Sequence, residues 1–88
     1  MLNIEVFSSP GCGKCGHAKV MLAKLVDELG EKQINWREVD ILKEIDYAVK
    51  IGVLSTPAIA FNGELIFTGM PSNKNLRAQI IYSLKNEN

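Results

Sequence analysis

One stretch of the chain decides its fold: LNIEVFSSPGCGKC, residues 2–15. Leu2, Ile4 and Val6 alternate there with polar residues, which predicts a short strand, and residues 8–11 supply the serine, proline and glycine that mark a turn. From Cys12 onward, apolar residues recur at spacings of three and four up to Gly30, which predicts a long amphipathic helix closed by that glycine. Both cysteines therefore stand where the first strand passes into the first helix.

The next segments predict a parallel crossover and a short second helix. Residues 34–39 are rich in β-forming side chains and follow the first helix directly, so strand, helix and strand form a right-handed parallel unit. Ile45, Ala48 and Val49 mark a shorter helix that Gly52 ends. The segment before Pro57 must then leave the helical region because of proline's steric demand, so a third strand begins at the proline.

A hairpin and a last helix complete the expected architecture. Asn62-Gly63 separates the apolar segments 58–61 and 64–67, and this pair favours a type I′ turn between antiparallel strands. Ser72 is a suitable cap for a final helix, whose sheet-facing positions are Leu76, Ile80, Ile81 and Leu84. The order is βαβ followed by αββα. It predicts an α/β fold with a mixed four-stranded sheet flanked by three helices on both faces.

Charge and length exclude several classes of partner. Ten Lys and Arg balance ten Asp and Glu among 88 residues, so no overall field favours nucleic acid or an anionic membrane. No apolar run approaches the roughly 18 residues of a membrane span, and the N-terminus lacks a basic region followed by an apolar one. No repeat or linker divides the chain. We therefore expect one domain over residues 1–88, a cytoplasmic monomer without nucleic-acid or membrane partners.

The two cysteines, Cys12 and Cys15, indicate redox chemistry rather than a structural staple. A disulfide that closes so short a loop removes little chain entropy, and the dispersed cysteines of small secreted domains are missing, which favours a reducing compartment. At a helix N-terminus, free backbone N–H groups and the helix dipole stabilise a thiolate, so we expect a lowered pKa at Cys12, with a small further contribution from Lys14. Cys15 lies one helical turn later on nearly the same face, within bonding reach.

Other interpretations of these residues exist. The cysteines can be inert packing residues, or two ligands of a zinc site completed by His17. At about 100° per residue, Cys15 lies roughly 60° from Cys12 and His17 roughly 140° on the other side, so the three do not converge well and we expect no metal. Lys19 and Lys24 either steer acidic partners or simply solvate the helix.

Three motifs together resemble the thioredoxin and glutaredoxin superfamily. They are Cys12-Gly13-Lys14-Cys15 after the first strand, Thr56-Pro57 before the third, and Asn62-Gly63 between the last two, in the order and spacing of that superfamily and over residues 2–84. The resemblance implies a thioredoxin-like fold in which Pro57 is cis and faces the dithiol. It also implies that Thr56 offers backbone hydrogen bonds to an extended substrate.

The details resemble small thioredoxins of glutaredoxin size more than glutaredoxins. Glutaredoxins usually carry an aromatic residue within the motif and a Gly-Gly-Asp segment after the last strand, where this chain has Gly13-Lys14 and TGMPS at residues 68–72. Thioredoxin's own pattern is also altered, because Gly11 replaces the tryptophan before the first cysteine and Val6 replaces the buried aspartate.

The resemblance implies a protein-disulfide reductase in which Cys12 attacks and Cys15 resolves. It would have no cofactor beyond the redox-active disulfide and would receive electrons from a flavin-containing thioredoxin reductase or a similar donor. The alternatives are a glutathione-dependent glutaredoxin and an iron-sulfur or metal carrier. The expected site comprises two catalytic residues, Cys12 and Cys15, and seven substrate-binding residues, Gly11, Gly13, Lys14, Thr56, Pro57, Gly69 and Met70.

Overall fold

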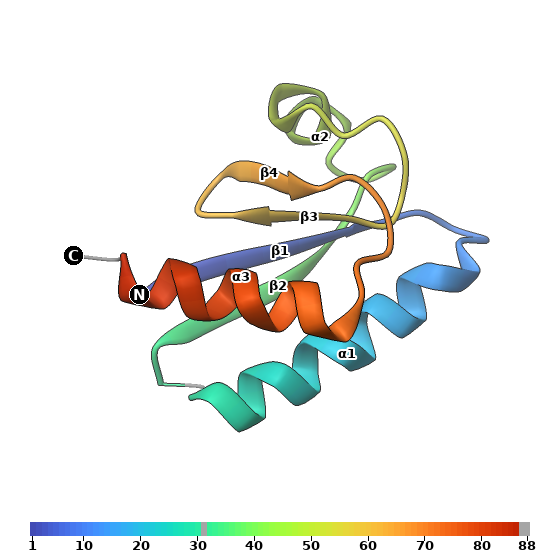
Figure 1. The fold of residues 1–88 in the computed structure, drawn as a ribbon. Coiled ribbons are helices and arrows are strands. Elements are labelled where there is room, and N and C mark those ends of the chain that lie inside the picture. The colour runs from blue at the N-terminus through green and yellow to red at the C-terminus, as the bar shows by residue number, and fades with distance from the viewer. Residues whose placement is uncertain (31, 87–88) are drawn as a thin grey trace.

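The computed structural model describes residues 1–30 and 32–86 and has the predicted order of elements (Figure 1). The elements are β1 (Leu2–Ser8), α1 (Gly13–Leu29), β2 (Ile34–Asp40), α2 (Ile45–Ile51), β3 (Ala58–Phe61), β4 (Glu64–Phe67) and α3 (Asn73–Lys85). Residues 31, 87 and 88 of the predicted domain lie outside the described residues.

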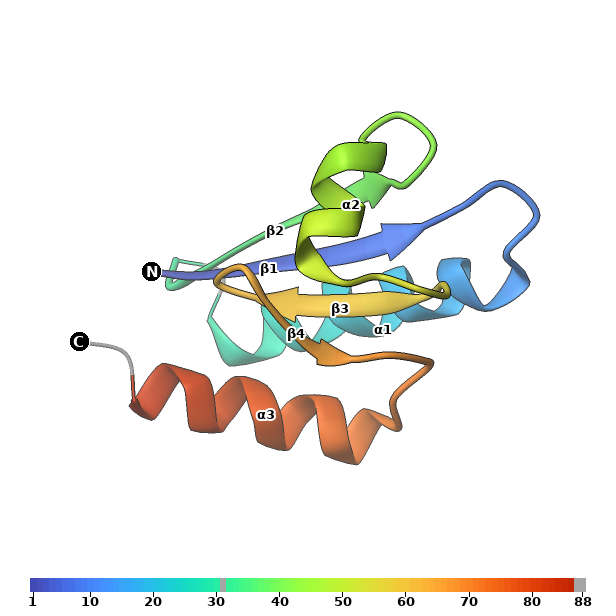
Figure 2. The ribbon, with the colours of Figure 1, turned by 90° about the horizontal axis from the view of Figure 1, so that it is seen from above.

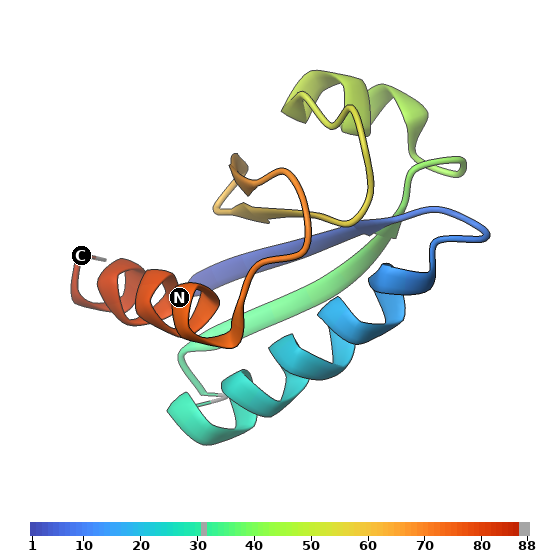
Figure 3. The same ribbon diagram turned by 45° about the vertical axis from the view of Figure 1, so that its right-hand side comes forward.

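The four strands form one mixed sheet in the order β2-β1-β3-β4. β1 pairs with β2 in parallel from Leu2↔Ile34 to Ser8↔Asp40, and it pairs with β3 antiparallel from Ile4↔Phe61 to Phe7↔Ala58. β3 and β4 are antiparallel. α1 and α3 lie on one face of the sheet and α2 on the other, as Figures 1 and 3 show. The predicted α/β architecture is confirmed.

The larger part of the core lies between the sheet and the pair α1 and α3. Alternate residues of β1 and β3 point into it, and the apolar faces of both helices cover them. Its fully buried side chains include Leu2, Ile4, Val6, Leu22, Ile59, Leu76 and Ile80. Of the predicted sheet-facing positions of α3, Leu84 packs against this core as well, whereas Ile81 stays half-exposed because it lies about 100° around the helix from Ile80.

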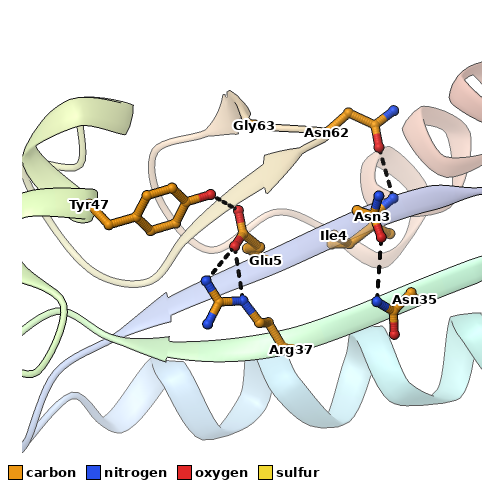
Figure 4. Close-up of a pocket in the computed structure, with 8 residues that line it drawn as sticks. All are labelled: Asn3, Ile4, Glu5, Asn35, Arg37, Tyr47, Asn62 and Gly63. Carbon is orange, nitrogen blue, oxygen red and sulfur yellow. Dashed lines mark hydrogen bonds and ion pairs between the residues drawn. The ribbon is translucent and has the colours of Figure 1, made fainter.

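The face beneath α2 is divided into an apolar and a polar half. Phe7 and Val39 form the apolar half with three alanines from α2 and β3. Toward the other end of β1, Glu5 accepts hydrogen bonds from Tyr47 and Arg37 (Figure 4), and Arg37 also pairs with Glu44 at 3.2 Å. The bond to Glu5 raises the pKa of Tyr47, because it stabilises the protonated phenol. Since α2 has seven residues, it shields one half of this face, and polar groups that satisfy one another occupy the rest.

The predicted turn and cap residues take their expected conformations. Asn62 and Gly63 have φ values of 51° and 83°, as a type I′ turn requires. Ser72 caps α3 by accepting a hydrogen bond from the backbone N–H of Asn75 at 3.1 Å. Gly52 ends α2 in the left-handed region. These local signals fix where the elements end.

From the burial of the leucines we predict that the same substitution changes the free energy of unfolding very differently at two positions. Leu22 is fully buried whereas Leu54 is 99% exposed. Leu22→Ala should lower the free energy of unfolding by about 2–5 kcal/mol, because it removes buried methyl groups and leaves a cavity. Leu54→Ala should change it by less than about 0.5 kcal/mol. Urea unfolding of both variants measures the difference, and similar losses would contradict the burial described here.

Candidate active site

A tight reversal between β1 and α1 places Cys12 at the end of the sheet. Cys12 is the N-cap residue of α1, with extended φ and ψ of −83° and 101°, and its N–H donates to the carbonyl oxygen of Ser9 at 3.2 Å. Gly11 has a φ of +79°, a left-handed conformation that glycine adopts without strain. The helix therefore begins at the cysteines, as predicted, and Cys12 stands at the end of α1 where the first backbone N–H groups have no intrahelical acceptor.

The two cysteines form a disulfide but differ in accessibility. Their Cα atoms are 5.4 Å apart, and the bond joins the N-cap to the first turn of α1. Cys15 lies on the buried face of α1 and is only 3% exposed, whereas Cys12 is half-buried at the surface. An incoming sulfur can therefore reach Cys12, while Cys15 is placed to react with Cys12 from inside.

The loop before β3 lies against the dithiol loop. The Thr56-Pro57 bond is cis, as the family resemblance implies, and Pro57 is buried. The hydroxyl oxygens of Ser9 and Thr56 are 2.8 Å apart in a hydrogen bond that ties the two loops together. Ser9 was not among the predicted site residues. The available signal was a hydroxyl residue shortly before the first cysteine.

A shallow hollow of about 300 Å³ surrounds Cys12. It brings together four of the predicted substrate-binding residues, Gly11, Gly13, Lys14 and Thr56, and adds Ser9 and Pro10. A Cβ atom added at Gly13 would meet no protein atom within 4 Å, so the space above this residue is open to a partner's backbone.

Met70 belongs to a second, larger hollow of about 690 Å³ that begins at Lys14. Met70 can lie near Lys14 because the connections β1–α1, α2–β3 and β4–α3 all lie at the same end of the sheet (Figure 2). Met70 sits in the last of these and also packs against the core. Gly69, its predicted companion, is exposed and lines neither hollow.

A small polar cluster at the end of β1 was missed by the sequence analysis. The buried hydroxyl of Ser8 donates to Glu38 at 2.7 Å, and Lys19 pairs with the same carboxylate oxygen at 3.0 Å. These contacts, the Ser8 hydrogen bond first, lower the pKa of Glu38. Glu38 is the partner of Val6 in the β1–β2 register, and Val6 is the residue that, by the resemblance described above, takes the place of a buried aspartate. Lys19 thus forms a partly exposed ion pair within the protein, a contact that neither interpretation of this residue included.

The described part of the chain contains no group of side chains that fits the zinc alternative. His17 is exposed on α1. Within residues 1–30 and 32–86, no three His, Cys, Asp or Glu side chains are grouped so as to hold a metal ion.

Comparisons with known proteins agree with this geometry. Residues 2–81 match a family model described as a thioredoxin domain. A probable thioredoxin of Methanothermobacter thermautotrophicus is 38% identical over 76 residues, covering 86% of this chain and 88% of that protein. NADPH-dependent thioredoxin reductase 3 of Arabidopsis thaliana is 33% identical over 84% of this chain but only 15% of its own length. A mutant thioredoxin from Halobacterium salinarum shares the fold, with a TM-score of 0.77 at 19% identity, over 99% of this chain and 76% of that one.

The Glu38 cluster predicts a specific pH dependence of stability. Because the folded protein lowers this pKa, the contribution of the carboxylate is present above its unfolded pKa of about 4.3 and is lost as the pH falls through the folded value. Glu38→Gln should therefore destabilise the protein at about pH 7, by at most about 1 kcal/mol for so exposed a pair, and less at about pH 3. Urea unfolding at both pH values measures this. A difference from wild type that does not shrink at low pH would contradict the assigned cause.

Proposed function

The chain belongs to the thioredoxin family and is a thiol-disulfide oxidoreductase, and from this premise we propose that it works as a cytoplasmic reductant of protein disulfides. The observation that carries the proposal is the pairing of an accessible Cys12 with a buried Cys15 beside the Thr56-Pro57 loop. The remaining parts of the proposal are the roles of the surrounding residues, the electron donor and the state of the protein in the cell.

The reduced dithiol acts in two exchange steps. The N–H groups at the start of α1 favour the Cys12 thiolate, which attacks one sulfur of the target disulfide and expels the other as a thiolate. Cys15, deprotonated, then attacks the Cys12 sulfur, which closes the Cys12–Cys15 disulfide and releases the second target thiolate. The target gains two electrons and, on protonation, two thiol hydrogens. The oxidised protein is the state that the structure contains.

The loops around Cys12 hold the target during these steps. Thr56 borders the hollow next to Cys12, and in this proposal its backbone hydrogen-bonds the extended substrate. Gly11 and Gly13 leave the approach to the sulfur free of side chains, and Lys14 adds a positive charge beside the reacting thiolate. Met70 extends the contact surface on the α1 side.

The electron donor in this proposal is a flavin-containing thioredoxin reductase or an enzyme of similar chemistry, with no cofactor bound by the chain itself. The similarity to a segment of a plant NADPH-dependent thioredoxin reductase supports a donor of this class over glutathione. The protein works as a monomer. No helix in the described part of the chain is long and apolar enough to cross a membrane.

Two cysteine variants distinguish the proposed mechanism from a glutathione-dependent one. Cys12→Ser should abolish reduction of insulin disulfides, because the attacking sulfur is gone. Cys15→Ser should lose turnover but accumulate mixed disulfides with the target, detectable by mass, because the resolving sulfur is gone. Full activity of Cys12→Ser would overturn the proposal. Turnover of glutathione mixed disulfides by Cys15→Ser would assign the chain to glutaredoxin chemistry instead.

A further inference from the structure

A stripe of basic side chains, two lysines and a histidine, leads away from the dithiol along α1. Lys14, His17 and Lys24 follow one another at helical spacings of three and seven residues, so they lie within about 80° of each other around the helix. All three are exposed. They line the hollow of about 690 Å³ that starts next to Cys12. We call this hollow the α1 groove.

The floor and far wall of the α1 groove are apolar or uncharged. Val20 and Met21 come from α1, and Met70 and Asn73 come from the loop before α3 and its first residue. Val20 is 55% exposed although it is a large apolar side chain. The groove thus combines a hydrophobic surface with a basic rim and contains no carboxylate.

The two lysines of the α1 groove have no ion-pair partner among the described residues. Lys19 is paired with Glu38, Arg37 with Glu5 and Glu44, and Arg77 with Glu28. Among the described residues, Lys14, His17 and Lys24 take part in no such ion pair. The chain as a whole has a formal net charge of zero, but Lys14 and Lys24 place two unpaired positive charges along the groove that begins beside the dithiol. A local field of this kind attracts negatively charged partners and raises their rate of association.

We propose that the α1 groove docks an acidic segment of the disulfide-containing protein substrate, adjacent in sequence to the cysteine that Cys12 attacks. This inference rests on the proposed function and adds a preference among its substrates. Aspartate or glutamate side chains of the segment pair with Lys14 and Lys24, and its apolar side chains contact Val20 and Met70.

The length of the groove sets how far the acidic residues lie from the target cysteine. Lys14 and Lys24 are separated by ten residues of α1, a rise of about 15 Å. An extended chain covers this distance in four or five residues at about 3.3 Å each. The acidic positions therefore lie within about five residues of the cysteine.

The test uses two synthetic peptide disulfides that differ only in having glutamate or glutamine at the positions flanking the cysteine. At low ionic strength the reduced protein should react with the acidic peptide about tenfold faster than with the neutral one, and the ratio should approach one at high salt, because screening removes the attraction. Lys24→Glu should bring the ratio to one or below.

A matched control separates position from net charge. Lys85→Glu makes the same charge change on α3, whose C-terminal end lies at the opposite end of the fold from the β1–α1 connection (Figure 1), and it should keep the wild-type ratio. A salt-dependent ratio lost equally in both variants would overturn the proposal, because it would reflect net charge alone.

The outcomes also separate this inference from the proposed function. If both peptides are reduced at equal rates at low salt, the chain is a disulfide reductase and the docking proposal is wrong. If neither is reduced, the proposed function itself fails. If reduced glutathione at millimolar concentration removes the preference by competing for the groove, the occupant is glutathione and the assignment to a protein segment is overturned.

Discussion

The antiparallel pairing of β1 with β3 is the constraint on which the site depends. Phe7 pairs with Ala58, so the residues after Phe7 and those before Ala58 must leave the sheet at the same end and side by side. One of these segments becomes the dithiol loop and the other the cis-proline loop, and the 2.8 Å hydrogen bond between Ser9 and Thr56 joins them. Sheet register, rather than any contact of the cysteines themselves, thus brings the cis-proline loop to Cys12.

The start of α1 then assigns different roles to two chemically identical groups. Cys12 is the half-buried N-cap residue of α1, whereas Cys15 lies in the first turn on the buried face of the helix, at 3% exposure. The same helix carries Lys14, His17 and Lys24 onward from the reactive sulfur. The reactive dithiol and the proposed docking residues therefore belong to one helix, whose inner face packs into the core through Leu22.

Local sequence patterns predicted the helices, strands and turns. The contacts between residues far apart in the sequence could not be predicted from such patterns. Alternation in residues 2–6, the Asn62-Gly63 turn and the Ser72 cap each depend on near neighbours, and the structure has all three features. The clusters of Ser8 with Glu38 and of Glu5 with Tyr47 join residues 30 and 42 positions apart, so no local pattern announces them. The motif resemblance implied the cis Thr56-Pro57 bond, which the structure has, because a family likeness carries long-range information. The resemblance did not indicate the hydrogen bond of Ser9 to Thr56.

The central claim is that the Cys12–Cys15 pair is a thioredoxin-like reductant. The most direct measurement is its redox equilibrium in dithiothreitol and, separately, in glutathione buffers, followed by alkylation and mass. The account predicts a potential near the thioredoxin value of about −270 mV, well below that of glutaredoxins, and no stable glutathione adduct. A potential of about −200 to −230 mV, with glutathione bound to Cys12, would contradict it.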